Sequence, residues 1–332
     1  MGLVRDVCVL GLGLIGGSVL RAAVAGGRRA WGASVSATDT EQAAADGFTT
    51  YPTVVDALGA AAQADAMIVI AVPLPAVDDV LRLIAAHAPD CLITDVVSVK
   101  RPVADAVDRV LPDARYVGGH PMAGTAESGW AAGSADLLRD AAWVVGIDEQ
   151  TQVEDWLAVA TLALVCGAVV VPAGLDEHDA AVARISHLPH LLAAVLASVG
   201  ADGGSLALSL AAGSFADGTR VAGSRPELVR AMCEGNRVAL LAAFDDALGR
   251  LGAARGSLAS TGSLAVTINA GHAAREHLVA QRAAEQELVK VDLDEPDALD
   301  VLRSYGATGA RVVALDGRTV TVETLAVTDG ER

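Results

Sequence analysis

A strand-like apolar run at residues 4–10 leads directly into Gly11-Leu-Gly13-Leu-Ile-Gly16, and a helical stretch follows. The glycine pattern alone would be weak in a chain with 34 glycines, but a strand before it and a helix after it are the setting that dinucleotide binding requires. Gly11 permits the tight turn, Gly13 lets the backbone approach a pyrophosphate, and Gly16 allows close helix–strand packing. The feature therefore predicts a Rossmann-type sheet that binds a dinucleotide.

The rest of the cofactor site is expected at the ends of the next strands. Leu14 and Ile15 open the helix, whose free amides and positive dipole end favour phosphate. Asp39 ends the second predicted strand at about the twenty-residue offset of a ribose-binding carboxylate. No Arg or Lys follows until Arg82, which favours NAD over NADP. Val72 ends the third strand and Pro73 follows it; with Ser98, after the fourth strand, they complete the predicted cofactor-binding set.

The first half of the chain alternates short apolar runs with amphipathic stretches, a pattern that indicates βαβ units and a parallel sheet. Strands are predicted at residues 4–10, 33–39, 66–72, 91–96, 115–117, 143–147 and 168–171, with helices at 15–25, 76–86, 103–110 and 153–164. Aromatic residues make up only 3% of the chain, so the core must consist mainly of Ala, Val and Leu.

The second half of the chain has a different pattern. Residues 176–288 show helical periodicity broken at 200–204, 213–218 and 223–226, with broad apolar faces suited to a dimer. A strand at 288–293, a helix at 296–305 and strands at 311–315 and 320–325 follow, the last two joined as a hairpin through Asp316-Gly317. We predict an α/β Rossmann-type domain (1–173), an all-helical substrate-binding and dimerisation domain (174–286) and a small β-α-β-β appendage (287–332).

Charge and cysteine content narrow the class of protein. Lys+Arg 24 against Asp+Glu 41 give a net charge of −17, which repels nucleic acid and anionic membranes. The four cysteines lie far apart without a CxxC pair, which fits a reducing cytoplasm. The apolar stretches 7–20 and 157–175 imitate a signal peptide and a membrane span, but both are interrupted by glycines, and the second also by Pro172.

Polar residues beyond the fourth predicted strand indicate chemistry. Ser98 and Lys100 follow that strand at the carboxyl edge where open α/β sheets bind ligands. His120 stands in a stretch too glycine-rich for regular structure. A loop histidine beside a cofactor crevice is a candidate proton acceptor because its ordinary pKa of about 6.5 lies near neutral pH. The alternative is an ordinary surface histidine.

A third group of polar residues opens the helical half. At 100° per residue, Asp179, Ser186 and His190 fall on one helix face, which indicates a site or a polar network. The histidines here lack the spacing of a zinc site, so no metal is expected. Farther on, Asp217 is placed to orient Arg220 toward an anionic substrate, unless the two form only a surface ion pair.

Together these residues resemble the prephenate dehydrogenase family, NAD-dependent enzymes of tyrosine biosynthesis, and most closely its actinobacterial members. The matching segments occur in family order and are GLGLIGGS (11–18), TDVVSVK (94–100), YVGGHPMAGT (116–125), EHDAAVARISHLPH (177–190) and AAGSFADGTR (211–220). They lie within residues 4–285, and five ordered motifs are far more specific than one glycine fingerprint.

The resemblance implies an NAD-dependent oxidative decarboxylation of prephenate to 4-hydroxyphenylpyruvate by a cytoplasmic homodimer. It makes His120 the acceptor of the ring hydroxyl's hydrogen bond, with Ser98 orienting both groups. His190 and Arg220 would hold substrate carboxylates. The remaining substrate-site residues implied are Ser186, Thr125, Asp179 and Asp217.

Two departures from the family pattern leave alternatives open. Ala126 stands where many members carry an acidic residue, and Glu127 follows one place later. If the carboxylate of Glu127 reaches the pocket, it favours the ammonium group of arogenate, which is therefore the alternative substrate. The C-terminal β-α-β-β stretch resembles half of an ACT domain, and either binds tyrosine as a feedback ligand or is a packing appendage. A non-enzymatic NAD-binding sensor would have no reason to keep Ser98, His120, His190 and Arg220 together. A 3-hydroxyacid dehydrogenase would need a catalytic lysine that the helical half does not supply.

Overall fold

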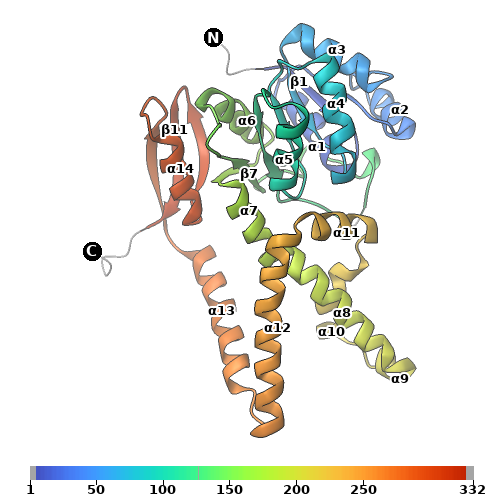
Figure 1. Cartoon of the computed structure of the whole chain (residues 1–332), viewed down its shortest axis with the longest axis vertical. Helices are drawn as coiled ribbons and strands as arrows, with labels where there is room; N and C mark the ends of the chain where they lie inside the picture. The colour runs from blue at the N-terminus through green and yellow to red at the C-terminus, as the bar shows by residue number, and fades with distance from the viewer. Residues whose placement is uncertain (1–4, 126, 327–332) are drawn as a thin grey trace.

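A computed structural model describes residues 5–125 and 127–326 of the chain. The first layer is a parallel five-stranded sheet of order β2-β1-β3-β4-β5 flanked by helices (Figure 1). Its strands are β1 (Val7–Leu10), β2 (Ala30–Ala33), β3 (Met67–Ile70), β4 (Ile93–Asp95) and β5 (Tyr116–Val117). Its helices are α1 (Leu14–Ala25), α2 (Ala37–Ala45), α3 (Val54–Ala64), α4 (Val77–His87) and α5 (Arg101–Val110), with the short 3₁₀ turn η1 (Leu74–Ala76). The predicted Rossmann-type architecture is confirmed.

The second predicted strand is placed wrongly. The chain pairs with β1 from Ala30 to Ala33, and the expected strand at 33–39 instead turns into helix α2. Ser36 caps that helix, because its Oγ accepts a hydrogen bond from Asp39 N at 3.3 Å. Tertiary pairing with β1 and this cap override the strand-like alternation of the sequence.

The chain changes sheets at Gly118. Beyond it lies a mixed six-stranded sheet of order β6-β7-β8-β10-β11-β9. Its elements are β6 (Gly119–Pro121), β7 (Ala142–Gly146), β8 (Val169–Ala173), β9 (Gln286–Asp292), β10 (Arg311–Asp316) and β11 (Thr319–Leu325), with η2 (Trp130–Ala132), α6 (Val153–Val165) and α14 (Ala298–Ala307). The strands predicted at 143–147 and 168–171 thus belong to this sheet rather than to one continuous parallel sheet.

The predicted C-terminal β-α-β-β order and its hairpin are confirmed. Gly317 takes the left-handed φ of +59° in a two-residue turn between the paired residues Asp316 and Thr319. Strand β10 pairs with β8, so these elements extend the second sheet. Helix α14 packs so closely on β8 that a Cβ on Gly306 would overlap the carbonyl oxygen of Pro172.

The predicted all-helical region is confirmed. It comprises α7 (Leu175–Val182), the π-helical turn η3 (Ala183–His187), α8 (Leu188–Asp202), α9 (Gly204–Ser209), α10 (Gly213–Thr219), η4 (Arg220–Gly223), α11 (Pro226–Gly235), α12 (Arg237–Ser260) and α13 (Ala265–Ala283). The break expected at 213–218 is instead helix α10. In Figure 1, α8 with α9 and the pair α12 and α13 project away from the sheets.

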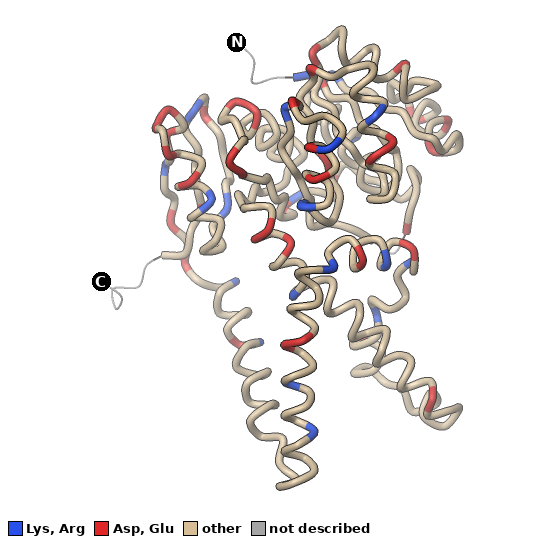
Figure 2. Tube along the Cα trace, viewed as in Figure 1, with Lys and Arg blue, Asp and Glu red and all other residues tan. Residues whose placement is uncertain are grey.

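The projecting helices expose apolar side chains and carry few charges (Figure 2). Exposed examples are Val199, Leu206, Leu210, Leu251, Val266 and Ile268. The helical stretch Leu175–Asp202 is long and apolar enough to cross a membrane by length and composition. Its first half carries the buried polar residues His178, Asp179 and His187. Residues 157–175, considered above as a span, form α6 and β8, with the helix-to-strand change that the sequence predicts.

Candidate functional site

The glycine-rich turn after β1 has the shape of a phosphate cradle. Gly11 has φ +103°, and a Cβ there would overlap the carbonyl oxygen of Ala71 on the neighbouring chain segment. A Cβ on Gly16 would overlap the carbonyl oxygen of Gly11. At Gly13, the N-cap of the twelve-residue helix α1, an added Cβ meets nothing within 4 Å. Two glycines are thus required by the fold, while the third leaves open space at a helix N-terminus, which fits a pyrophosphate.

Asp39 does not lie where a ribose-binding carboxylate was expected. It lies in the first turn of α2, and its Oδ1 accepts a hydrogen bond from the backbone N–H of Trp130 at 2.8 Å. The residues that directly follow β2 are Ser34 and Val35, the second of which is 97% exposed. Hydroxyl and apolar groups, rather than a carboxylate, therefore stand at the end of this strand.

The other predicted cofactor residues follow the central strands. Val72 and Pro73 follow β3, and Ser98 lies in the turn between β4 and α5, half-buried. These positions line the carboxyl edge of the sheet, beside the turn that starts at Gly11. The order of strands therefore brings the predicted cofactor residues, Asp39 excepted, to one edge of the sheet.

The turn that carries Ser98 is fixed by a buried ionic network. The fully buried Lys100 ammonium forms an ion pair with Asp95, and the Tyr116 hydroxyl donates to Asp95 Oδ2 at 2.7 Å. The backbone N–H groups of Val97 and Gly119 also donate to this carboxylate. Burial lowers the pKa of Lys100, against the opposing effect of Asp95. The network joins the end of β4 to the start of β6, where the candidate base lies.

His120 lies on β6 and is only 9% exposed, in a strand rather than the predicted loop. Its Nδ1 lies 2.8 Å from His178 Nε2, and His178 Nδ1 lies 2.8 Å from Asp179 Oδ1. The two imidazole rings meet edge to face. Residues from β6 and α7, 58 positions apart, therefore form a continuous relay from a carboxylate to His120.

The relay determines which nitrogen of His120 carries the proton. An ionised Asp179 accepts, so His178 Nδ1 donates to it and neutral His178 Nε2 is left as an acceptor. His120 Nδ1 must then donate to His178, which leaves a lone pair on His120 Nε2. That atom is the one free to take a proton from a bound hydroxyl.

The ionisation states agree with this assignment. Burial, with smaller contributions from His178, Lys100 and His187, holds the pKa of His120 well below 6.5, so the ring is neutral at pH 7. Burial alone would raise the pKa of Asp179. Hydrogen bonds from His178 and from the backbone N–H groups of Lys100 (2.8 Å) and Arg101 (2.9 Å) outweigh burial, and the net pKa is lowered.

The predicted polar face of residues 179–190 is interrupted by the π-helical turn Ala183–His187. A π turn advances fewer degrees per residue than the 100° assumed, so Asp179 and His190 no longer share one face. Asp179 points to α5, whereas His190 is half-buried and its Nδ1 lies 2.8 Å from the carbonyl oxygen of Ser186. His190 Nδ1 therefore donates to that carbonyl, and Nε2 remains for a ligand.

His187 is a second buried histidine of the site. The amide of Asn236 donates to the carbonyl oxygen of Asp179 at 2.7 Å and lies 3.1 Å from His187 Nδ1. Because the amide nitrogen donates, His187 Nδ1 accepts and Nε2 carries the proton. Burial lowers the pKa of His187 to about 4. His187 is thus a neutral donor, the opposite tautomer from His120.

The predicted anion-binding residues lie on exposed segments. Arg220 opens η4, which packs along α8, the helix that carries His190. Asp217 and Arg220 are both exposed. Thr125 is exposed, and its Oγ1 accepts from Glu127 N at 3.2 Å. Ala126 lies outside the described residues.

His178 and His187 lie within the sequence motif 177–190, but the predicted site gave neither of them a role. Their contacts span β6, α7 and α11–α12 and follow no local pattern. A paired His178-Asp179 beside a second histidine motif was the available signal. No group of His, Cys, Asp and Glu suited to a metal ion occurs in the part of the chain that the structure describes.

Comparisons with known proteins agree with these two regions. Residues 24–172 match the family model of the prephenate dehydrogenase nucleotide-binding domain. Residues 175–261 match that of the prephenate dehydrogenase dimerization domain.

Individual proteins of known name or structure are also similar to this chain over most of its length. A prephenate dehydrogenase from Bacillus subtilis is 33% identical over 256 residues, which cover 74% of this chain and 68% of that protein. A cyclohexadienyl dehydrogenase from Zymomonas mobilis is 31% identical over 270 residues, covering 78% and 90%. A crystal structure from Corynebacterium glutamicum, provisionally described as a prephenate dehydrogenase, has a TM-score of 0.87 and 44% identity, and covers 92% of this chain and 98% of that one.

Proposed function

The chain belongs to the prephenate dehydrogenase family, and from that premise we propose that it oxidises and decarboxylates prephenate to 4-hydroxyphenylpyruvate with NAD. The single observation that carries the proposal is the relay Asp179–His178–His120, which leaves a neutral Nε2 acceptor on His120. A non-enzymatic NAD sensor would not need a buried proton acceptor oriented in this way.

The proposed reaction starts with a proton transfer. His120 Nε2 accepts the proton of the ring hydroxyl, and the ring carbon that bears this hydroxyl gives its hydride to NAD. The charge that develops on His120 is stabilised through His178 by the carboxylate of Asp179, without a change of tautomer. Ser98, in the turn held by Asp95 and Lys100, is the candidate for orienting the hydroxyl.

Decarboxylation completes the reaction. The new ketone makes the ring carboxylate a vinylogous β-keto acid, so the bond to that carboxylate breaks and its electron pair enters the ring. The ring becomes aromatic, carbon dioxide leaves, and the phenolate oxygen takes the proton back from His120. Because a phenol has a pKa near 10 and that of His120 is well below 6.5, this return is favourable. Orientation, one base and anion binding are therefore sufficient.

Substrate carboxylates are assigned to His190 and Arg220, with Ser186, Thr125 and Asp217 in support. His190 keeps Nε2 for a ligand, and the exposed Arg220 lies on the element packed along the same helix. Asp179 is buried and tied to His178 and α5, so we assign it to positioning the base instead of contacting substrate.

Arogenate is the alternative substrate. The exposed carboxylate of Glu127 follows Thr125 closely and is a candidate partner for the ammonium group of arogenate. We propose prephenate as the preferred substrate, since the acidic position directly after Thr125 is occupied by Ala126.

We further propose a cytoplasmic homodimer joined through the helical domain. The match of residues 175–261 to a dimerization domain and the exposed apolar side chains of α8, α9, α12 and α13 support the dimer. The four cysteines are free, and three of them are buried, as suits a reducing compartment. Tyrosine is proposed as a feedback ligand, supported by the β-α-β-β order of residues 286–325.

The test is the rate of NADH formation by the purified chain with prephenate and, separately, with arogenate. We expect the higher kcat/KM with prephenate. A higher value with arogenate would keep the chemistry but assign specificity to Glu127, and the variant Glu127→Gln would then lower the arogenate rate selectively. No turnover with either substrate would overturn the proposed function.

A further inference from the structure

His187 is a buried titratable residue that the proposed reaction leaves without a role. It ends the π-helical turn Ala183–His187 and is only 1% exposed. Its Nδ1 lies 3.1 Å from the side-chain amide nitrogen of Asn236, whereas Nε2 has no hydrogen-bond partner among the described residues. Nε2 is not one of the fully enclosed atoms that lack a partner, so it belongs to the small part of the ring that a ligand can reach.

Asn236 fixes which nitrogen of His187 carries the proton. The backbone carbonyl oxygen of Asp179 can only accept, so at 2.7 Å it must face the –NH2 group of Asn236. The second hydrogen of that group is directed to His187 Nδ1, which accepts it, and Nε2 carries the ring hydrogen. Burial lowers the pKa of His187 to about 4, so the ring is neutral at pH 7. Nε2 is therefore a neutral donor as long as Asn236 is in place.

The junction of α11 and α12, which carries Asn236, packs on the carboxyl edge of the first sheet. A Cβ on the neighbouring Gly235 would lie 2.5 Å from Leu74 and 3.6 Å from Val99. Leu74 and Val99 belong to the segments that follow β3 and β4, and these segments also carry predicted cofactor residues. His187 therefore lies where the helical domain meets the predicted cofactor edge.

His187 is also close to the candidate base and to a candidate substrate-binding residue. After burial, His178, Lys100 and His187 contribute to the lowered pKa of His120. His190 follows His187 by three positions at the start of α8, and residues at this spacing are neighbours on a helix, with Cβ atoms about 5–6 Å apart. The donor on His187 thus accompanies the histidine that is assigned to a substrate carboxylate.

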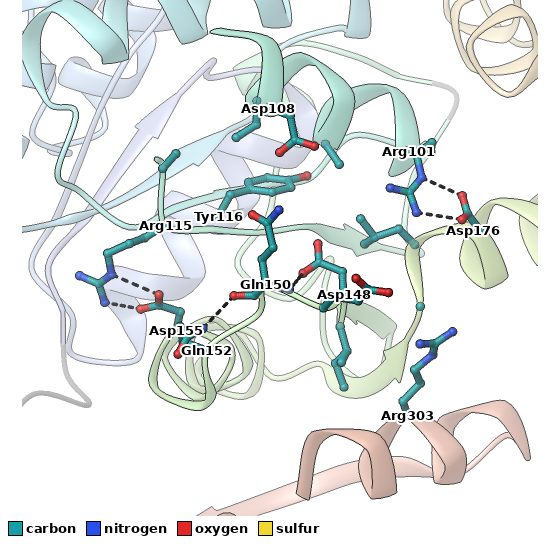
Figure 3. Close-up of a pocket in the computed structure, with 17 residues that line it drawn as sticks. Arg101, Asp108, Arg115, Tyr116, Asp148, Gln150, Gln152, Asp155, Asp176 and Arg303 are labelled. Atoms are coloured by element: carbon teal, nitrogen blue, oxygen red, sulfur yellow. Dashed lines mark hydrogen bonds and ion pairs between the residues drawn. The ribbon is translucent and has the colours of Figure 1, made fainter. Parts of the chain in front are cut away.

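The large cavity drawn in Figure 3 is not the place where this donor acts. Arg101 and Asp176 line that cavity of about 460 Å³, and no histidine is among the described residues that line it. Arg101 contributes its side chain to the cavity, whereas its backbone N–H donates to Asp179 at 2.9 Å. His187, linked through Asn236 to the carbonyl oxygen of Asp179, belongs instead to the histidine cluster of the candidate site.

A neutral N–H group beside a carboxylate-binding histidine matches an α-keto acid. The side chain of prephenate carries a keto oxygen and a carboxylate on adjacent carbons, and arogenate has an ammonium group in place of the keto oxygen. The keto oxygen accepts a hydrogen bond from Nε2–H, whereas an ammonium group offers only hydrogens to it. Two facing donors leave each other unpaired, and a buried site strongly disfavours unpaired polar groups.

We propose that His187 Nε2 donates to the keto oxygen of prephenate while His190 holds the adjacent carboxylate. Asn236, by fixing the tautomer of His187, makes this position select a keto acid over an amino acid. His187 is thus a specificity residue, and Asn236 is a positioning residue. This inference rests on the proposed function and names the group that distinguishes its two candidate substrates.

The kinetic test compares kcat/KM for prephenate and for arogenate in two variants of His187. His187→Leu removes the donor and should lower the prephenate value about 3- to 10-fold through KM, without lowering the arogenate value. His187→Gln places an amide near the position of Nε2, and this amide can rotate to donate to a keto oxygen or to accept from an ammonium group. It should keep the prephenate value within about threefold and raise the arogenate value.

A variant of Asn236 tests the tautomer separately. Asn236→Leu removes the –NH2 group with little change of size, so His187 can take either tautomer and the preference for prephenate should fall. A residue with only a structural role would lower both substrate values together. His87→Leu, at the exposed last residue of α4, is the control and should leave the preference as in the unsubstituted chain.

A binding experiment gives a measurement that needs no turnover. Calorimetric titration of the NAD-loaded chain compares 4-hydroxyphenylpyruvate with 3-(4-hydroxyphenyl)propionate, which lacks the keto oxygen. The unsubstituted chain should bind the keto acid about 3- to 10-fold more tightly, and His187→Leu should bind the two probes equally.

The outcomes separate this inference from the proposed function. Four results would each overturn the role of His187: a preference of the unsubstituted chain for arogenate, an equal loss with both substrates in His187→Leu, an unchanged preference in that variant, or no tighter binding of the keto acid. Tighter binding of the keto acid that is lost in His187→Leu, in a chain that turns over neither substrate, would uphold the contact and refute the proposed function alone.

Discussion

Replacing Asp179 by asparagine tests the relay behind His120. Asp179 Oδ1 accepts from both His178 Nδ1 and Lys100 N, so the oxygen of the introduced amide keeps this position and its –NH2 group replaces Oδ2 beside Arg101 N. The tautomers of His178 and His120 are then retained, but the negative charge that stabilises the imidazolium of His120 is lost. The substitution leaves every residue that is assigned to contact substrate or cofactor unchanged.

The size of the effect follows from the lost charge. A hydrogen bond to a charged group is worth roughly 1.5–3 kcal/mol, or about 10- to 150-fold in rate, for stabilising the imidazolium. Because His120 Nε2 keeps its lone pair, we expect Asp179→Asn to lower kcat by about 10- to 150-fold with little change in KM or in NAD affinity.

The assay is steady-state NADH formation with prephenate, combined with NAD titration to verify that the variant is folded. Asp105→Asn, the same change at an exposed position of α5, is the control. If Asp179→Asn keeps kcat within about threefold of the unsubstituted chain while binding NAD normally, the carboxylate of Asp179 does not stabilise the imidazolium of His120.

Three further predictions follow from the site. Gly13→Ala should fold normally but bind NAD more weakly. Gly11→Ala should lower the free energy of unfolding by about 1–3 kcal/mol, because Gly11 has a φ of +103° and an added Cβ would meet a carbonyl oxygen. Thermal unfolding and NAD titration distinguish the two variants. The reaction requires neutral His120, and burial holds the pKa of this histidine well below 6.5. The value of kcat/KM should therefore stay constant as the pH falls to 6.5 and decline only at lower pH, as His120 becomes protonated. A decline centred near pH 6.5 would show that burial does not lower the pKa of His120. Ser34→Asp should raise the ratio of kcat/KM for NAD to that for NADP, because it introduces a carboxylate at the end of β2. Asp39→Asn should leave this ratio unchanged, because Asp39 accepts a hydrogen bond from Trp130 N and does not lie at the end of β2.

The local signals in the sequence predicted local structure well. The turn after β1 follows from glycines whose roles depend on immediate neighbours, and the C-terminal hairpin follows from Gly317 between two strand-like runs. The sequence prediction put Asp39 at the end of a strand because the alternating pattern of residues 33–39 is typical of a strand. The strand ends earlier, at Ala33, which pairs with Leu10. The capping pair Ser36 and Asp39 was the local signal for a helix instead.

What remained hidden depends on tertiary contacts. The role of His178 arises only when β6 and α7 meet, and a π-helical turn cannot be inferred from a 100° periodicity. The change of sheets at Gly118 likewise depends on the pairing of β6 with β7, and β10, from the far end of the chain, extends that sheet by pairing with β8. Motifs supplied the candidate reacting residues, whereas the residues proposed to position them could be found only from the fold.

The most direct test of the proposed reaction is its stoichiometry. Purified chain with prephenate and NAD should form NADH, carbon dioxide and 4-hydroxyphenylpyruvate in equal amounts. His120→Asn, which removes the base, should bind NAD normally and form all three about 10²–10⁴-fold more slowly. NADH formed without carbon dioxide, or full activity in His120→Asn, would contradict the account.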